Sequence, residues 1–164
     1  MYKMTALQAE QPDQPAELVN MAIPVPEAGQ VLVRSQYSSI NYKDALAVTG
    51  KGRILRDFPM IPGIDIAGEV LQSEDNRFSP GDQVLMTGRG LGERFNGGYS
   101  PYQVLPAENI ILCPENLTLR ESMVFGTAGF TAALAIHRMM ENHKAPENGF
   151  RFPRENPPSK CSSN

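Results

Sequence analysis

The residues best suited to chemistry lie in the short segment Ser38–Asp44, which contains Asn41 and Tyr42. Asn41 offers an amide hydrogen-bond donor, and Tyr42 offers a phenol with an aromatic face. Such donors stabilise negative charge that develops on a reacting group. The structural alternative is that Asn41 bonds its own backbone at a strand end and that Tyr42 covers a core edge. The segment predicts a candidate catalytic pair, Asn41 and Tyr42, with both alternatives open. Asp44 is expected to cap a following helix or to orient Lys43.

A second polar region is the segment Thr87–Gly98, which contains Arg89 and Asn96 among five glycines. This mixture is typical of a mobile rim that contacts a substrate, and a solvated loop charge is the alternative for Arg89. The stretch Gly88–Gly92 is the nearest approach to a phosphate-binding loop. It opens no amphipathic helix, so we interpret it as a flexible cleft loop.

The chain offers few ligands for a metal ion. A catalytic zinc needs three converging N, S or O ligands, and the soft ligands are two histidines and two cysteines: His137, His143, Cys113 and Cys161. The two histidines are six positions apart, which misaligns them on a helix. We therefore expect no metal site and two free thiols.

Short β-like runs, each bounded by Gly, Pro or other turn formers, fill the first two thirds of the chain. The expected strands are Lys3–Ala9, Glu17–Met21, Gln30–Ser38, Ile64–Gln72, Gln83–Met86, Tyr99–Leu105 and Ile110–Cys113. Their number and spacing are typical of a small barrel or sandwich.

The hydrophobic period changes after Pro114. Thr118 and Glu121 form a capping-box pattern that predicts the start of a helix. The segment Gly126–Gly129 interrupts that helix, and a second one should run to about Asn142. Its apolar face comprises Phe130, Ala133, Leu134, His137 and Met140.

Charge and composition exclude several classes of protein. The 164 residues carry a net charge of −3 and no basic cluster along the sequence, which argues against a nucleic-acid or membrane surface. No run approaches the roughly 20 apolar residues of a membrane span, and the N-terminus lacks a secretory signal. We expect a cytoplasmic protein whose partner is a small molecule or another protein. Residues 1–149 should form one domain, and residues 150–164 a disordered tail.

Four motifs together resemble the medium-chain dehydrogenase/reductase superfamily. They are Ser38–Asp44, Pro62–Val70, Gly97–Ser100 and Gly126–Ala132, in that order. The chain is most similar to the zinc-free quinone oxidoreductase branch, closest to the acryloyl-CoA reductase group, over roughly residues 1–149. The resemblance implies a mainly β fold with C-terminal helices, a GroES-like bent β-barrel with the Rossmann domain missing. Full-length members are homodimers.

The resemblance also implies a function: the substrate-side domain of an NADPH-dependent oxidoreductase. Its substrate would be an activated double bond of the acryloyl-CoA type or a quinone. Asn41 and Tyr42 would lie beside the nicotinamide, with Tyr42 and Thr131 contacting the cofactor. Thr127 is a further cofactor-binding candidate or a plain N-cap.

The remaining candidates concern the substrate. Arg89, Asn96 and Asp65 are the expected substrate-binding residues, and Asp65 is expected to form hydrogen bonds within the cleft. Asn41 and Ile64 stand where the zinc branch has Cys and His, so the resemblance also implies no zinc. The alternatives are a free-standing GroES-like binding module and an inactive truncated product. The isolated chain should be nearly inactive as an oxidoreductase, because the resemblance implies that most of the NADPH site lies outside it.

Overall fold

The structure is a computed structural model that describes residues 2–142. The predicted tail 150–164, His143 and Cys161 lie outside the described residues. The chain divides into two units at Phe130 and Thr131. Within residues 2–142, no helix has the length and apolar character that a membrane span requires.

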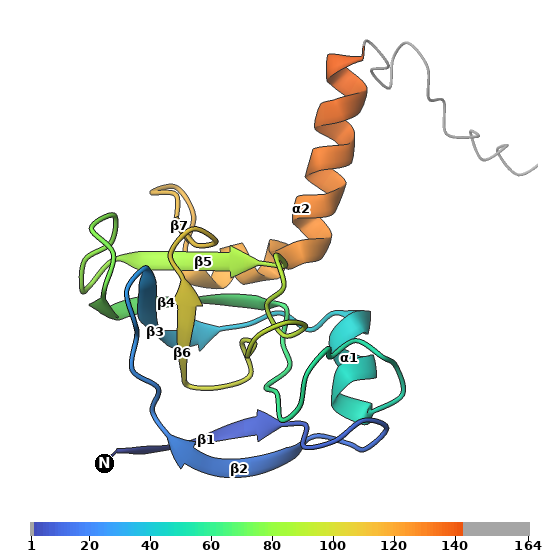
Figure 1. The fold of residues 1–164 in the computed structure, drawn as a ribbon. Coiled ribbons are helices and arrows are strands. Elements are labelled where there is room, and N and C mark those ends of the chain that lie inside the picture. The colour runs from blue at the N-terminus through green and yellow to red at the C-terminus, as the bar shows by residue number, and fades with distance from the viewer. Residues whose placement is uncertain (1, 143–164) are drawn as a thin grey trace, which may run out of the picture. The chain divides into compact units, whose positions relative to one another are not determined.

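The first unit is mostly β, as predicted, and its strands form two antiparallel sheets (Figure 1). One sheet pairs β1 (Lys3–Gln8) with β2 (Glu17–Ala22). The other has the order β6-β3-β4-β5-β7. Its strands are β3 (Gln30–Tyr37), β4 (Asp65–Ser73), β5 (Gln83–Thr87), β6 (Tyr102–Pro106) and β7 (Ile111–Leu112). Each predicted strand is present, although β6 begins at Tyr102 rather than Tyr99.

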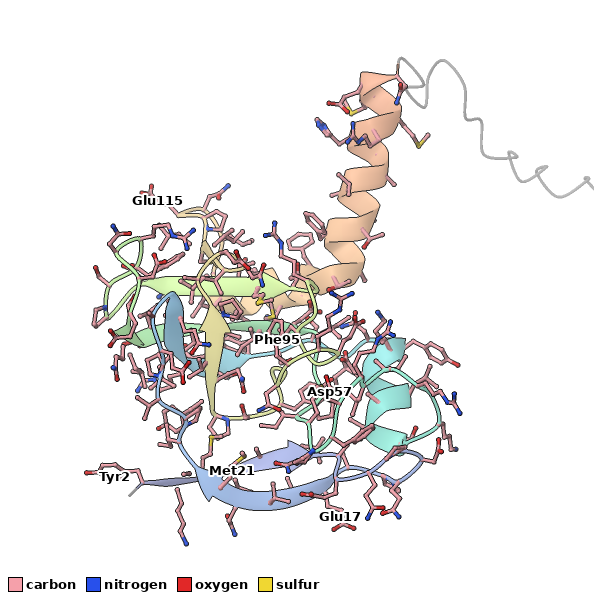
Figure 2. The ribbon with its side chains drawn as sticks, viewed as in Figure 1. Tyr2, Glu17, Met21, Asp57, Phe95 and Glu115 are labelled. Carbon is pink, nitrogen blue, oxygen red and sulfur yellow. The ribbon has the colours of Figure 1, made fainter. Side chains whose placement is uncertain are left out.

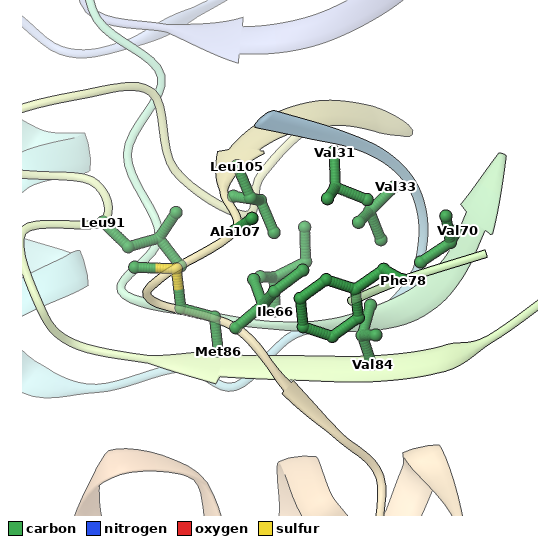
Figure 3. Packing of buried hydrophobic residues seen from close by; sticks show 11 residues of the cluster. Val31, Val33, Ile66, Val70, Phe78, Val84, Met86, Leu91, Leu105 and Ala107 are labelled. Carbon is green, nitrogen blue, oxygen red and sulfur yellow. The ribbon is translucent and has the colours of Figure 1, made fainter. Parts of the chain in front are cut away.

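The main hydrophobic core lies on the five-stranded sheet (Figure 3). Alternate residues of neighbouring strands supply it, because successive side chains of a strand point to opposite faces. The principal contributors are Val31, Val33, Ile66, Val70, Val84, Met86 and Leu105. This core fixes the end of β3 and the start of β4, which lead into the candidate site.

Helix α1 (Tyr42–Thr49) follows β3 and is held by a separate cluster. Its Ala47 packs with Ala9, Leu55 and Met60. The helix ends at Gly50, whose φ of 67° is the left-handed conformation that favours glycine at a helix C-terminus. The sequence predicted this helix only through the expected capping role of Asp44.

Helix α2 (Leu119–Glu141) begins with the predicted capping box. The backbone N–H of Thr118 donates to Glu121 (2.9 Å), and the Glu121 N–H donates to the Thr118 hydroxyl (3.1 Å). At Gly126 the backbone leaves the helical conformation, with φ 49° and ψ −157°. The predicted interruption is therefore a sharp kink at one glycine. Leu119 and Met123, before the kink, pack on Ala67.

Candidate functional site

The segment between β3 and α1 is fixed by its two serines. The Ser38 hydroxyl donates to the backbone carbonyl of Asp65 (2.7 Å), and the Ser39 hydroxyl donates to that of Met123 (2.7 Å). The Tyr99 hydroxyl donates to the Ser39 carbonyl (3.1 Å). The loop that carries Asn41 is therefore attached to β4, to α2 and to the loop before β6.

Asn41 is the N-cap of α1, and its side chain lies between two buried carboxylates. Its Nδ2 donates to Asp44 Oδ2 (3.0 Å) and to Asp65 Oδ2 (2.8 Å). Its backbone N–H also donates to Asp44 Oδ2 (2.8 Å). Both amide hydrogens are committed to carboxylates. Oδ1 takes part in the capping box of α1 with the Asp44 backbone N–H, and its second lone pair is left to meet a ligand. The predicted catalytic role of Asn41 stays a prediction, and in this structure its two amide hydrogens meet carboxylates.

Asp44 and Asp65 are 1% and 0% exposed, and each is satisfied by uncharged donors. Asp44 Oδ1 accepts from the backbone N–H of Ile64 (3.0 Å). Asp65 Oδ1 accepts from the Thr127 hydroxyl (2.6 Å), and its Oδ2 accepts from the Thr127 N–H (3.1 Å). A buried carboxylate persists only when hydrogen bonds replace its water, and these contacts supply that replacement.

Asp65 also joins β4 to the start of the helical segment after the kink. Its carboxylate accepts the Thr127 N–H at the positive end of that segment, where negative charge is favoured. Gly126 makes this approach possible, because a Cβ there would lie 2.4 Å from Ser39 Oγ and 2.8 Å from Asp65 Oδ2. Only glycine fits both the positive φ and the space.

The phenol of Tyr99 responds to the same charges. Burial, followed by the negative charge of Asp44, a hydrogen bond to Asp44 and the charge of Asp65, raises the pKa of Tyr99 well above its ordinary value. Tyr99 therefore stays protonated and acts as a donor. Neither its contact with this network nor the role of Gly126 was predicted, because nothing in their local sequence signals a contact with residues so distant along the chain.

Tyr42 is the most accessible candidate, since it begins α1 and is 80% exposed. The alternative that Tyr42 covers a core edge is therefore wrong. Exposed apolar side chains stand on the segments that flank the network: Ile40, Val124 and Phe125. The candidate site thus combines a buried polar network with exposed apolar and aromatic groups.

The other predicted site residues occupy different places. Arg89 is exposed, and its guanidinium donates weakly to the Glu108 carbonyl (3.4 Å), away from the Asn41 network. Asn96 Oδ1 accepts from the Ile61 N–H (2.9 Å) and so fastens its loop. Thr131 belongs to the second unit, where it is an exposed helical residue.

The rim segment Thr87–Gly98 is more firmly packed than the sequence indicated. Leu91 is fully buried in the main core, and Phe95 packs against that core. Among residues 2–142, no three His, Cys, Asp or Glu side chains are placed to hold a metal ion.

Comparison with known proteins identifies relatives of this arrangement. The alcohol dehydrogenase GroES-like domain family matches residues 27–115. The chain is 50% identical over 119 residues to YhfP of Bacillus subtilis, named as a candidate quinone oxidoreductase. It is 43% identical over 121 residues to the acrylyl-CoA reductase AcuI of Ruegeria pomeroyi. These alignments cover 73% and 74% of this chain but only 36% and 37% of the relatives.

Two solved structures match the same fold. The structure of YhfP with NAD bound superimposes with a TM-score of 0.82 and 42% identity, covering 91% of this chain and 46% of that one. The structure of Escherichia coli YhdH with bound NADPH gives a TM-score of 0.78 and 43% identity, covering 88% and 45%. The chain therefore spans less than half the length of these proteins.

Proposed function

The chain belongs to the alcohol dehydrogenase GroES-like domain family, and we propose that it is the substrate-side domain of an NADPH-dependent oxidoreductase. The proposed acceptor is an activated carbon–carbon double bond of the acryloyl-CoA type, or a quinone. The names of YhfP and AcuI support this chemistry. Because the chain spans about 36–37% of those relatives, the proposal concerns what this domain contributes to the reaction.

The observation that carries the proposal is the fixed Asn41 beside the exposed Tyr42. The two buried carboxylates and the capping box of α1 hold the Asn41 amide in one orientation, which leaves one lone pair of Oδ1 for a ligand. Tyr42, the next residue, presents a phenol and an aromatic face to solvent. A rigid acceptor atom next to an exposed aromatic donor is suited to holding a flat, polar ring.

The described residues fit one end of NADPH. The acceptor Oδ1 of Asn41 suits the amide donor of a nicotinamide, and the Tyr42 ring suits its flat face. Pyrophosphate has no such fit within residues 2–142, because the glycine-rich stretch Gly88–Gly92 follows β5 and opens no helix. NADPH, when bound, supplies a hydride that adds to the β-carbon of an unsaturated thioester, while a proton adds to the α-carbon.

The remaining candidates take different proposed roles. Asp65 is a positioning residue, because its carboxylate holds both Asn41 and Thr127. Thr127 and Thr131 stay proposed cofactor contacts on the helical segment after the kink. Arg89 and Asn96 stay proposed substrate contacts on the rim, with Asn96 also fastening the loop.

A chimera tests the proposal. Residues 1–142 would replace the matching N-terminal part of Ruegeria pomeroyi AcuI, and NADPH oxidation would be followed with acryloyl-CoA and with a quinone. We expect turnover with at least one acceptor. Tyr42→Ala should lower it at least tenfold, because the exposed aromatic contact is lost.

Tyr2→Ala is the matched control, since Tyr2 is also exposed (87%) but precedes β1, and it should leave turnover unchanged. Asn41→Ala should lower turnover together with nicotinamide binding. A folded chimera that reduces neither acceptor, or that is insensitive to both site variants, would contradict the proposal.

A further inference from the structure

Three segments that carry basic residues meet next to the candidate site. Lys43 lies in the first turn of α1, Arg56 follows that helix, and Arg94 belongs to the rim segment. The Arg56 N–H donates to the backbone carbonyl of Glu93 (2.8 Å), so the two arginine-bearing segments touch. Figure 2 labels Asp57 and Phe95, the residues after the two arginines, in the same region beside α1. The sequence shows no basic cluster because this one forms only in the fold.

The acidic residues of these segments do not form ion pairs with the two arginines. The Glu93 carboxylate forms an ion pair with the Lys43 ammonium group. Asp57 is exposed and is the other acid of these segments. Among the described residues, neither the Arg56 guanidinium nor the Arg94 guanidinium has a hydrogen-bond or ion-pair partner. Both remain available to an anionic ligand.

The backbone that carries these arginines is anchored on both sides. Leu55, next to Arg56, is 8% exposed and packs against α1. Leu91 is fully buried and Phe95, next to Arg94, packs against the main core. A ligand would therefore meet two arginines on fixed backbone, which lowers the entropy lost on binding.

We propose that Arg56 and Arg94, flanked by Lys43, bind the phosphate groups of a coenzyme A thioester. The inference rests on the proposed function and selects between its two substrate classes, because a quinone carries no phosphate. Guanidinium groups match phosphate oxygens in paired hydrogen bonds. Lys43 directly follows Tyr42 in the chain, so the cationic group adjoins the proposed reaction site, and the pantetheine arm of the thioester would lead toward Tyr42.

Calorimetric titration of the full 164-residue chain with coenzyme A tests this proposal without any cofactor. We expect coenzyme A to bind and pantetheine, which lacks phosphate, to give no detectable heat. The double variant Arg56→Gln/Arg94→Gln should weaken coenzyme A binding at least tenfold. Added salt should weaken the wild-type interaction, since the contacts are exposed.

Arg120→Gln is the matched control, because it removes the same charge from an exposed arginine beside a different surface cleft lined by Gln36 and Tyr37. It should leave the affinity unchanged. Absent coenzyme A binding, or binding unaffected by the double variant, overturns the proposal. Equal binding of NADP⁺ with an equal loss in the double variant assigns the group to a dinucleotide phosphate and also overturns it. Failure of the chimera with intact coenzyme A binding would instead reject the reductase function alone.

Discussion

The kink in α2 offers the sharpest test of how the candidate site is assembled. We predict that Gly126→Ala destabilises the protein strongly, because the added methyl group would lie 2.4 Å from Ser39 Oγ and 2.8 Å from Asp65 Oδ2. Neither oxygen can retreat without lengthening a hydrogen bond, to the Met123 carbonyl or to Thr127. The change therefore strains the backbone and the polar network together.

The magnitude follows from two contributions. A non-glycine residue at φ 49° and ψ −157° costs about 1–3 kcal/mol. Each weakened hydrogen bond costs about 1 kcal/mol, and two are affected. We expect the free energy of unfolding to fall by about 3–5 kcal/mol, a large share of the usual 5–15 kcal/mol of a domain.

Urea denaturation followed by circular dichroism measures this loss. Gly88→Ala is the control, because Gly88 also has a positive φ (62°) but a Cβ there meets no atom within 4 Å. It should cost about 1 kcal/mol from the backbone alone. If Gly126→Ala destabilises the protein no more than Gly88→Ala does, the crowding argument is refuted.

Three further predictions concern the residues around the site. Asp65→Ala should lower the free energy of unfolding by about 3 kcal/mol or more in urea denaturation, since three donors lose their acceptor, whereas Asp65→Asn should restore most of it. The raised pKa of Tyr99 means that the folded state holds its proton more tightly; stability should fall as pH rises above about 10, and Tyr99→Phe should flatten that decline in pH-dependent unfolding while Tyr102→Phe should not. Thr118→Ala should lower thermal stability by about 1 kcal/mol through loss of the helix cap.

The elements that depend on local pattern were predictable from the sequence. Short apolar runs bounded by turn formers located the seven strands of residues 2–142, including Gln30–Tyr37, to within three residues at each end. The start of α2 followed from the reciprocal spacing of Thr118 and Glu121. These elements depend on the spacing of apolar residues and on hydrogen bonds between residues at most four positions apart. Both can be inferred from the order of residue types in the sequence.

The polar network depends on distant contacts and was only partly predicted. Asn41 and Asp65 were each identified as candidates, but their 2.8 Å contact joins residues 24 positions apart. The pairing of the Asn41 amide with Asp44 and Asp65 was therefore not predicted. Tyr99 and Gly126 act through segments that meet only when β4 and α2 pack, so their local sequence carries no signal of the role.

The negative charge of the Asp44 and Asp65 carboxylates affects which charges can develop during the proposed reaction. Asp44 and Asp65 place negative charge at the site, and this charge adds to the effect of burial in raising the pKa of Tyr99. A nicotinamide that gives up a hydride gains positive charge, which nearby carboxylates favour, whereas negative charge on the acceptor would be disfavoured there. The Asn41 amide cannot supply the compensating donor, because both of its hydrogens already meet carboxylates. We propose that the exposed Tyr42 hydroxyl supplies this donor, so its loss should impair turnover in addition to any effect of losing the ring on cofactor binding.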